Sequence, residues 1–178
     1  MPAPTGPPPG RARGERAKLA ETDVTIRRYA RRDRAAVLEI TRSSFGGFCL
    51  ESGMEEKFGL LDGTDWAERK CAGIDYDLRR HPEHALVAVA GGRVVGFVCT
   101  RVYSDYSIGH VANMAVHKDS QGQGIGRALL EAALHQFRRQ GLRYARIETL
   151  EHNARGRELY PSCGFTEVGR QIFYFREI

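Results

Sequence analysis

The segment His110-Val-Ala-Asn-Met-Ala-Val116 is followed by a polar turn and then by Gln121-Gly-Gln-Gly-Ile-Gly-Arg127. The first run is short, apolar and partly β-branched, which predicts a buried strand. Behind the glycines, apolar residues recur at helical spacing from Leu129 to Phe137, and Gly141 marks the end of a helix. The glycines leave the backbone N–H groups bare at the point where the helix and its dipole begin. The whole segment therefore predicts a turn that binds a phosphate.

Two common phosphate-binding patterns do not fit this turn. A mononucleotide P-loop ends in Gly-Lys-Ser/Thr, whereas Gly126 is followed by Arg127 and Ala128. The dinucleotide fingerprint G-x-G-x-x-G also differs, because Gly122, Gly124 and Gly126 alternate strictly. A nicotinamide-dependent oxidoreductase would require a different spacing of the glycines.

Gln121, Gly124 and Gly126 resemble the three defining positions of the Gln/Arg-x-x-Gly-x-Gly/Ala signature of the GNAT superfamily of N-acetyltransferases. Farther along, Asn153-x6-Tyr160-x3-Gly-Phe resembles the second half of that pattern. The motif spacing is similar to that of the branch that acetylates the N-terminal alanine of ribosomal proteins. The resemblance covers roughly residues 24–178. It implies an α/β (α+β) fold of the GNAT type, with a mixed, mostly antiparallel central sheet and helices on both faces.

The remaining apolar patterns and turns predict elements that fit such a sheet. Asp65 and Glu68 form a capping box that opens a helix ending before Pro82, and Gly91-Gly92 joins the two strands of a hairpin. Residues 45–63 form a long loop punctuated by glycines, which is typical of functional loops or of short helical turns. The other predicted elements are strands at 24–27, 84–90, 93–102 and 144–150, helices after Asp33 and at 153–163, and two terminal strands at 165–170 and 172–176.

The chain has 178 residues, enough for one domain with a sizeable core, and we expect this domain at 23–178. Residues 1–22 are rich in Pro and Arg and are predicted to be a disordered leader. The net charge of +5 arises within residues 1–34, so nucleic-acid binding is not expected. The four cysteines lack metal-ligand spacing, and neither a signal peptide nor a membrane span is found. We therefore expect a cytoplasmic protein with no metal and no membrane partner.

The resemblance implies acetyl-CoA as co-substrate and direct attack by a primary amine through a tetrahedral intermediate. Backbone amides of the glycine turn would bind the pyrophosphate, and the edge of the preceding strand would bind the pantetheine arm and stabilise the oxyanion. The residues expected to bind the coenzyme are Met114, Ala115, Val116, Gln121, Gly122, Gln123, Gly124, Ile125, Gly126, Arg127 and Asn153.

Three side chains are candidates for the acid–base chemistry. Tyr160 matches the tyrosine that returns a proton to the coenzyme sulfur, and its alternative is a tyrosine packed in the core. Glu148 matches the base of the ribosomal branch, and its alternative is an ion pair with Arg146 or Arg143. His110 is a competing base, and its alternative is a hydrogen-bonded residue at the start of a strand.

The sequence leaves the acceptor amine open. Residues 45–80 hold eight acids and five bases, which favours a cationic acceptor. Only thirteen residues follow Phe165, too few for the long final loop that the resemblance implies for a peptide groove. A small-molecule amine and a peptide or protein N-terminus therefore both stay open. The alternative function is a catalytically degenerate module that binds acyl-CoA as a regulatory ligand, and the oligomeric state stays open between a monomer and a homodimer.

Overall fold

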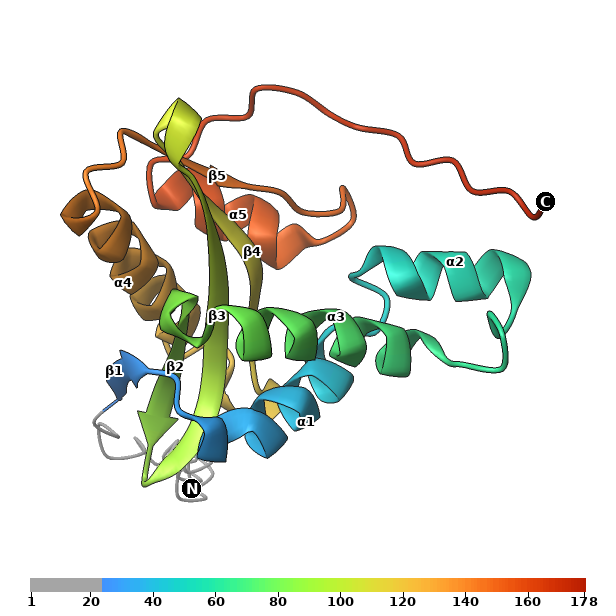
Figure 1. Cartoon of the computed structure of the whole chain (residues 1–178), viewed down its shortest axis with the longest axis horizontal. Helices are drawn as coiled ribbons and strands as arrows, with labels where there is room; N and C mark the ends of the chain where they lie inside the picture. Colours follow the sequence, from blue (N-terminus) through green and yellow to red (C-terminus); the bar gives the residue numbers. More distant parts are fainter. Residues whose placement is uncertain (1–23) are drawn as a thin grey trace, which may run out of the picture.

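The computed structural model describes residues 24–178, so the predicted leader lies outside the described residues. One sheet contains five strands in chain order, and only the last two neighbours are parallel (Figure 1). The predicted α/β class and the mostly antiparallel sheet are thus confirmed. The strands are β1 (Thr25–Arg28), β2 (Ala85–Ala90), β3 (Arg93–Tyr103), β4 (Ile108–Val116) and β5 (Tyr144–Ile147).

Helices cover both faces of this sheet. The α-helices are α1 (Arg34–Ser44), α2 (Leu50–Phe58), α3 (Trp66–Arg80), α4 (Ile125–Arg139) and α5 (Ala154–Ser162). Short 3₁₀ turns are η1 (Arg31–Asp33), η2 (Pro82–His84), η3 (Ser104–Tyr106) and η4 (Lys118–Ser120). Among the described helices, none combines the length and the apolar character needed to cross a membrane.

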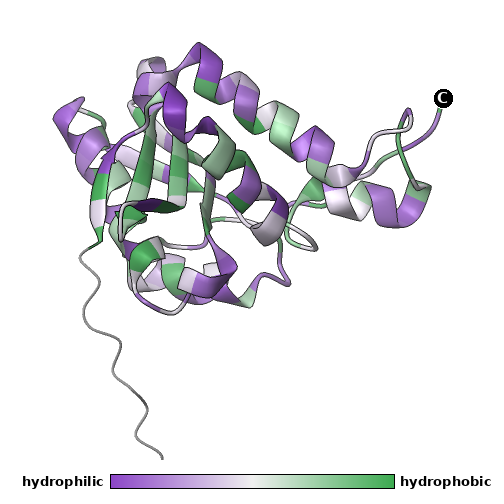
Figure 2. Ribbon diagram, turned by 90° about the horizontal axis from the view of Figure 1, so that it is seen from below, coloured by the Kyte–Doolittle hydropathy of each residue, from purple (hydrophilic) through white to green (hydrophobic). Residues whose placement is uncertain are grey.

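The core has two layers because the strands bury side chains on both faces. On one face, α1 and α3 pack Val37 and Ile74 against Phe97 of β3. On the other face, α4 packs Leu129 and Phe137 against the sheet. Figure 2 shows the apolar residues concentrated on the strands between these helices. Burial on both faces explains why the central strands read as continuous apolar runs in the sequence.

Two local predictions are confirmed in atomic detail. The Glu68 N–H donates to Asp65 Oδ1 at 2.7 Å and the Asp65 N–H donates to Glu68 Oε2 at 3.2 Å, which is the capping box at the start of α3. Gly91 and Gly92 join β2 to β3 with φ values of 56° and 76°. A two-residue hairpin turn with positive φ at both positions suits the twist of the flanking strands.

A β-bulge in β4 shapes the functional end of the sheet. Cys99 pairs with Asn113 and Thr100 pairs with Val111, so Ala112 has no partner on β3. One extra residue moves every following side chain to the other face of the sheet. Val111 accordingly packs on the α4 face, whereas Ala115 packs on the α1 and α3 face.

Three predicted features differ from the structure. The strand expected at 144–150 ends at Ile147, and the segment at 45–63, expected as a functional loop or as short helical turns, contains the full helix α2. The two terminal strands are wrong, because no described residue after β5 belongs to a strand. The segment after α5 instead runs in extended form toward α2, where the rings of Phe175 and Phe58 lie 5.2 Å apart (Figure 1). Its apolar alternation is typical of a strand, but a strand needs a neighbour for its backbone hydrogen bonds.

Replacing Gly109 by alanine is expected to destabilise the fold. A Cβ at this position would lie 2.4 Å from Cγ of the buried Phe137, which is too close for any real contact. Overpacking of this kind costs about 1–3 kcal/mol. The matched control is Gly73→Ala on the exposed face of α3, where no atom lies within 4 Å and alanine should stabilise by about 0.5–1 kcal/mol. Urea unfolding checks both variants, and equal stabilities would contradict the packing at Gly109.

Candidate active site

The strands β4 and β5 separate after four residue pairs, and the candidate site lies at this opening. Their last pair is Val111 with Ile147, directly before the bulge. Backbone groups alternate in direction along a strand. The His117 N–H donates to Val95 on β3 at 2.8 Å, so the backbone groups of Met114 and Val116 point to the open edge. The opening therefore presents unpaired backbone groups in the middle of a sheet.

One of these backbone groups, the Val116 carbonyl, already accepts hydrogen bonds within the chain. The Val116 carbonyl accepts hydrogen bonds from Gln121 Nε2 at 2.9 Å and from Ser44 Oγ at 3.1 Å. Gln121 thus fixes the glycine turn to the end of β4, and Ser44 fixes the end of α1 to the same atom. The sequence gives no sign of the Ser44 contact, because 72 positions separate the two residues.

The glycine turn leaves backbone N–H groups without side chains around them, as the sequence predicts. Gly122 and Gly124 have φ values of 77° and 78°, a region that suits glycine. The first helical hydrogen bond of α4 runs from the Ala128 N–H to the Gly124 carbonyl at 3.0 Å. The amides of Ile125, Gly126 and Arg127 therefore stand outside the helical ladder at the positive end of the dipole. This arrangement can bind an anion.

The Arg127 side chain does not point toward this anion position. Its guanidinium donates to the Ser162 carbonyl at 3.1 Å and to Ser162 Oγ at 2.7 Å. It ties the start of α4 to the end of α5. A Cβ on Gly126 would lie at an ordinary contact distance of 3.5 Å from Leu159, so α5 packs directly against the start of α4.

The two bases that compete in the sequence form one hydrogen-bonded pair. His110 Nε2 lies 2.9 Å from Glu148 Oε1 and 3.0 Å from Oε2. His110 is 5% exposed, whereas the Glu148 side chain is 56% exposed. Burial lowers the pKa of the His110 imidazole, and Glu148 opposes that effect. A neutral imidazole that donates from Nε2 would hold the carboxylate in place.

Two further side chains complete the surroundings of this pair. Arg146 Nε lies 3.2 Å from Glu148 Oε2, so the ion pair that the sequence offers as an alternative is present as well. The Tyr103 ring stacks on His110, with centroids 6.0 Å apart and planes 22° apart. Tyr103 is the last residue of β3, and no sequence pattern indicated its contact with His110.

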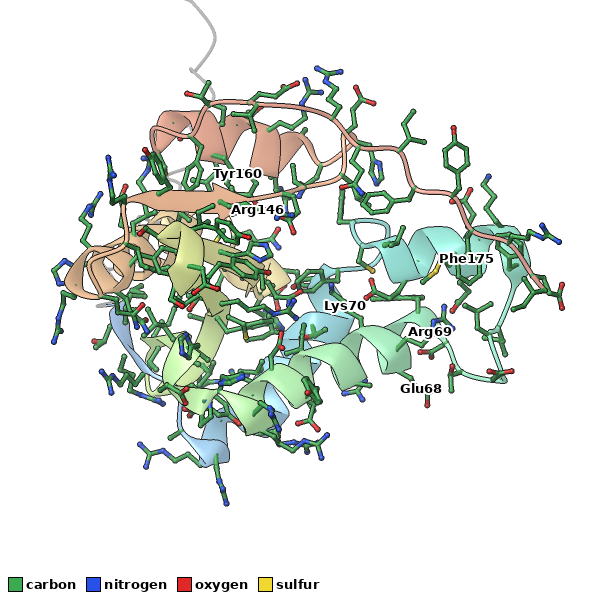
Figure 3. The ribbon with its side chains drawn as sticks, turned by 45° about the horizontal axis from the view of Figure 1, so that its top comes forward. Glu68, Arg69, Lys70, Arg146, Tyr160 and Phe175 are labelled. Atoms are coloured by element: carbon green, nitrogen blue, oxygen red, sulfur yellow. The ribbon has the colours of Figure 1, made fainter. Side chains whose placement is uncertain are left out.

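Tyr160 lies on the other face of the opening. It belongs to the cluster packed against α4, whereas His110 and Arg146 occupy paired positions on the α1 and α3 face. Figure 3 shows Tyr160 on α5 and Arg146 on β5, and Lys70 on α3. Burial, assisted by the charge of Glu148, raises the pKa of Tyr160, so its hydroxyl keeps its proton. Its ring also lies 6.3 Å from that of Phe165, which is the core contact considered as the alternative.

Asn153 acts within the chain as the N-cap of α5. Its Oδ1 accepts from the Gly156 N–H at 3.2 Å, and its Nδ2 donates to Thr149 Oγ1 at 2.8 Å. Both ends of the amide are therefore engaged, and the expected contact with the pantetheine arm stays a prediction.

A cavity lies between the α1–α2 connection, α2, the start of α3 and the loop after β5. Its volume is about 420 Å³, and Leu150, two residues after Glu148, is part of its wall. His152 Nε2 contacts the Gly47 carbonyl and so joins the loop after β5 to the α1–α2 connection. The lining residues are Gly47, Cys49, Ser52, Gly53, Glu55, Glu56, Trp66, Leu150 and His152.

The acidic excess near this cavity is largely neutralised. Glu55 lies 3.4 Å from Arg69, and Glu51 lies 3.7 Å from Lys70. Five of the eight acids in residues 45–80 have such partners, namely Glu51, Glu55, Glu56, Asp75 and Asp77. The composition of this stretch is therefore weak support for a cationic acceptor.

Comparisons with known proteins agree with this geometry. The model of the acetyltransferase (GNAT) family matches residues 35–165. A mycothiol acetyltransferase from Stackebrandtia nassauensis is 27% identical over 161 residues, which cover 87% of this chain and 48% of that protein. A mycothiol acetyltransferase from Thermomonospora curvata is 36% identical over 93 residues, which cover 52% of this chain and 31% of that protein. The chain thus spans half or less of the length of these curated relatives.

Solved structures share the fold at low sequence identity. The ribosomal-protein alanine N-acetyltransferase from Escherichia coli has a TM-score of 0.61 at 23% identity, covering 82% of this chain and 79% of that chain. The PaiA N-acetyltransferase from Thermoplasma acidophilum, solved in complex with coenzyme A, has a TM-score of 0.65 at 19% identity, covering 80% and 89%.

The buried His110 predicts a dependence of stability on pH. Its pKa is lowered in the folded state, so the unfolded chain, with a pKa of about 6.5, takes up the proton first as pH falls. Stability is therefore lost from about pH 6.5 downward, by at most about 1.4 kcal/mol per pH unit. Urea unfolding at pH 7.5 and 5.5 should show a smaller loss for His110→Gln. The exposed His135→Gln is the control, and equal losses in all three proteins would contradict this reading.

Proposed function

The chain belongs to the acetyltransferase (GNAT) family, and from this premise we propose that it transfers an acetyl group from acetyl-CoA to a primary amine. The observation that carries the proposal is the placement of acid–base groups on opposite faces of one opening. Glu148, held by His110, lies on the α1 and α3 face. Tyr160 lies on the α4 face, beside the helix that begins at the glycine turn. An amine and a thioester can approach each other from these two sides.

The coenzyme side is built from backbone groups. The free amides of Ile125, Gly126 and Arg127 fit a diphosphate at the start of α4. The open edge of β4 at Met114 fits an extended arm that pairs like a strand. When bound, acetyl-CoA supplies the thioester whose carbonyl carbon is attacked. A β4 amide at the opening can donate to the developing oxyanion, an interaction worth about 3–4 kcal/mol per donor.

The side chains move the protons. The amine nitrogen forms a bond to the carbonyl carbon and gives a tetrahedral intermediate, and the carbon–sulfur bond breaks when this intermediate collapses. Glu148 takes the proton from the amine, directly or through a water. Tyr160, protonated because burial raises its pKa, donates its proton to the departing sulfur. His110 orients the Glu148 carboxylate, which Arg146 contacts as well.

The acceptor is proposed to enter through the cavity whose wall includes Leu150, two residues after Glu148. A volume of about 420 Å³ lies within the range of small-molecule sites, so a small-molecule amine would fit there. The curated relatives are named for mycothiol, and the lining of Trp66, Ser52 and Glu55 offers both apolar and polar contacts to an amine.

Removing the proton carriers should lower turnover without weakening coenzyme binding. Glu148→Gln and Tyr160→Phe are each expected to reduce kcat by about 10²–10⁴-fold, because general acid–base catalysis contributes that much. Thiol release over a panel of amines gives kcat, and calorimetry gives the acetyl-CoA Kd. The matched control is Glu151→Gln, an exposed carboxylate in an ion pair with Arg170, which should retain full activity.

The outcomes separate the two functions that the sequence leaves open. Thiol release that requires Tyr160 supports the enzyme. Acetyl-CoA binding without thiol release for any amine favours a regulatory module. An unchanged rate in both variants would overturn the proposed roles, and the absence of acetyl-CoA binding would overturn the proposed function as a whole.

The glycine turn yields a second prediction, on coenzyme affinity. Gly124→Ala places a side chain at a φ of 78°, which costs roughly 1–2 kcal/mol and shifts the turn. We expect the acetyl-CoA Kd to rise by about tenfold. Gly141→Ala is the control, because Gly141 has a φ of 75° at the far end of α4. Both variants should lose similar stability in urea unfolding, and an equal acetyl-CoA Kd would contradict the role of the turn.

A further inference from the structure

The turn between α3 and β2 brings together three side chains of the kinds that bind metals. The sequence His81-Pro82-Glu83-His84 enters β2 through the 3₁₀ turn η2. His81 precedes this turn as its N-cap, and His84 is the last residue of the turn. His81 and His84 are three apart, and their ring centroids lie 5.7 Å from each other. Glu83 lies between them in the sequence, and none of the three belongs to the proposed active site.

The ligand atoms already have the spacing of a metal site. Glu83 Oε1 lies 3.5 Å from His81 Nδ1 and 3.4 Å from His84 Nε2, and all three atoms lie within 4.8 Å of one another. Zinc binds imidazole and carboxylate at about 2.0–2.2 Å, so neighbouring ligand atoms of a tetrahedral site stand about 3.4 Å apart. Two of the three spacings match this value.

The backbone holds these residues in place. The His81 N–H donates to the Asp77 carbonyl at 2.8 Å, and the His84 N–H donates to the His81 carbonyl at 3.0 Å. Gln136 Nε2 of α4 donates to the Glu83 carbonyl at 3.1 Å. Thr100 Oγ1 of β3 donates to the His84 carbonyl at 2.9 Å. The turn is therefore fixed to three elements, and only the side chains of the three ligands need to adjust.

The second nitrogen of His84 supports a ligand role. Its Nδ1 is buried and has no hydrogen-bond partner in the part of the chain that the structure describes. A cavity of about 10 Å³ lies against this ring and is lined by Asp77 and Thr100 among others. This volume is about the minimum that can hold one water molecule. Metal-binding histidines commonly donate their other ring N–H to a water or a carbonyl.

We propose that His81, Glu83 and His84 bind a divalent transition-metal ion, with zinc as the expected ion, through Nδ1, a carboxylate oxygen and Nε2. Imidazole and carboxylate ligands suit zinc, copper and nickel, and the half-exposed His81 and Glu83 leave a fourth position to solvent. The ion would connect the end of α3 to the start of β2. The cysteine spacing predicts no metal, and no cysteine takes part in this cluster.

The proposal is tested by titrating the untagged, full-length protein with ZnCl₂ in a calorimeter. We expect one equivalent to bind. Each of His81→Ala, Glu83→Gln and His84→Ala should weaken binding by at least about tenfold, because even the loss of a group that only hydrogen-bonds a metal ligand costs about 10–100-fold in affinity. His135→Ala, an exposed histidine on α4, is the matched control and should bind like the wild-type protein. With CoCl₂, the visible absorption bands of tetrahedral Co²⁺ should appear and should vanish in His81→Ala.

Zinc should also raise the Tm of the wild-type protein but not that of the ligand variants, since an ion that binds only the folded state stabilises it. His81 is exposed, so its alanine variant should fold, and circular dichroism checks this. Unchanged zinc affinity in His81→Ala and Glu83→Gln, or no zinc binding to the wild-type protein, would overturn the proposal. These measurements do not depend on acetyl transfer. A failure of the metal proposal is therefore distinguishable from a failure of the proposed function.

Discussion

One unpaired residue in β4 is the constraint on which the site depends. Ala112 has no partner on β3, and β4 stops pairing with β5 at the residue before it. A bulge bends its strand and increases the local twist, which accounts for the separation of two parallel neighbours in the middle of the sheet. A closed sheet would leave no free backbone groups at Met114. The rest of the fold supports this opening, because α1 and the glycine turn both bind the Val116 carbonyl at its end.

The opening also places the proposed base and the proposed acid on opposite faces of the sheet. Side chains on either side of a strand belong to different core layers, so His110 and Glu148 meet on the layer of α1 and α3, and Tyr160 arrives from α5 on the other layer. Burial acts on both groups in the direction that the proposed chemistry needs. It lowers the pKa of His110, which favours the neutral imidazole, and raises the pKa of Tyr160, which keeps the hydroxyl protonated. The separation of acid and base thus follows from the arrangement of layers.

Sequence patterns anticipated most of the fold and part of the site. Capping at Asp65, the glycine hairpin at Gly91 and the turn at Gly124 depend on neighbours within a few residues, and the structure confirms them. The terminal strands were wrong because strand formation requires a partner that local alternation cannot supply. In the sequence, Glu148 and His110 are alternative candidates for the catalytic base, because 38 positions separate them. Only the parallel register of β4 and β5 shows that their side chains form a hydrogen-bonded pair. The cluster at His81 depends on a 3₁₀ turn that cysteine spacing does not reveal.

The sequence by itself determined the elements, the two-sided core and the family, because periodicity, capping and turn chemistry are local properties of the chain. The tertiary structure alone decided where β4 and β5 part, which carboxylate meets which imidazole, and which acids are neutralised by bases. It placed Glu55 against Arg69 and the wall of the cavity around Leu150 and Trp66. These relations join residues far apart along the chain. They follow from strand register and helix packing, which are fixed only when the whole core has formed.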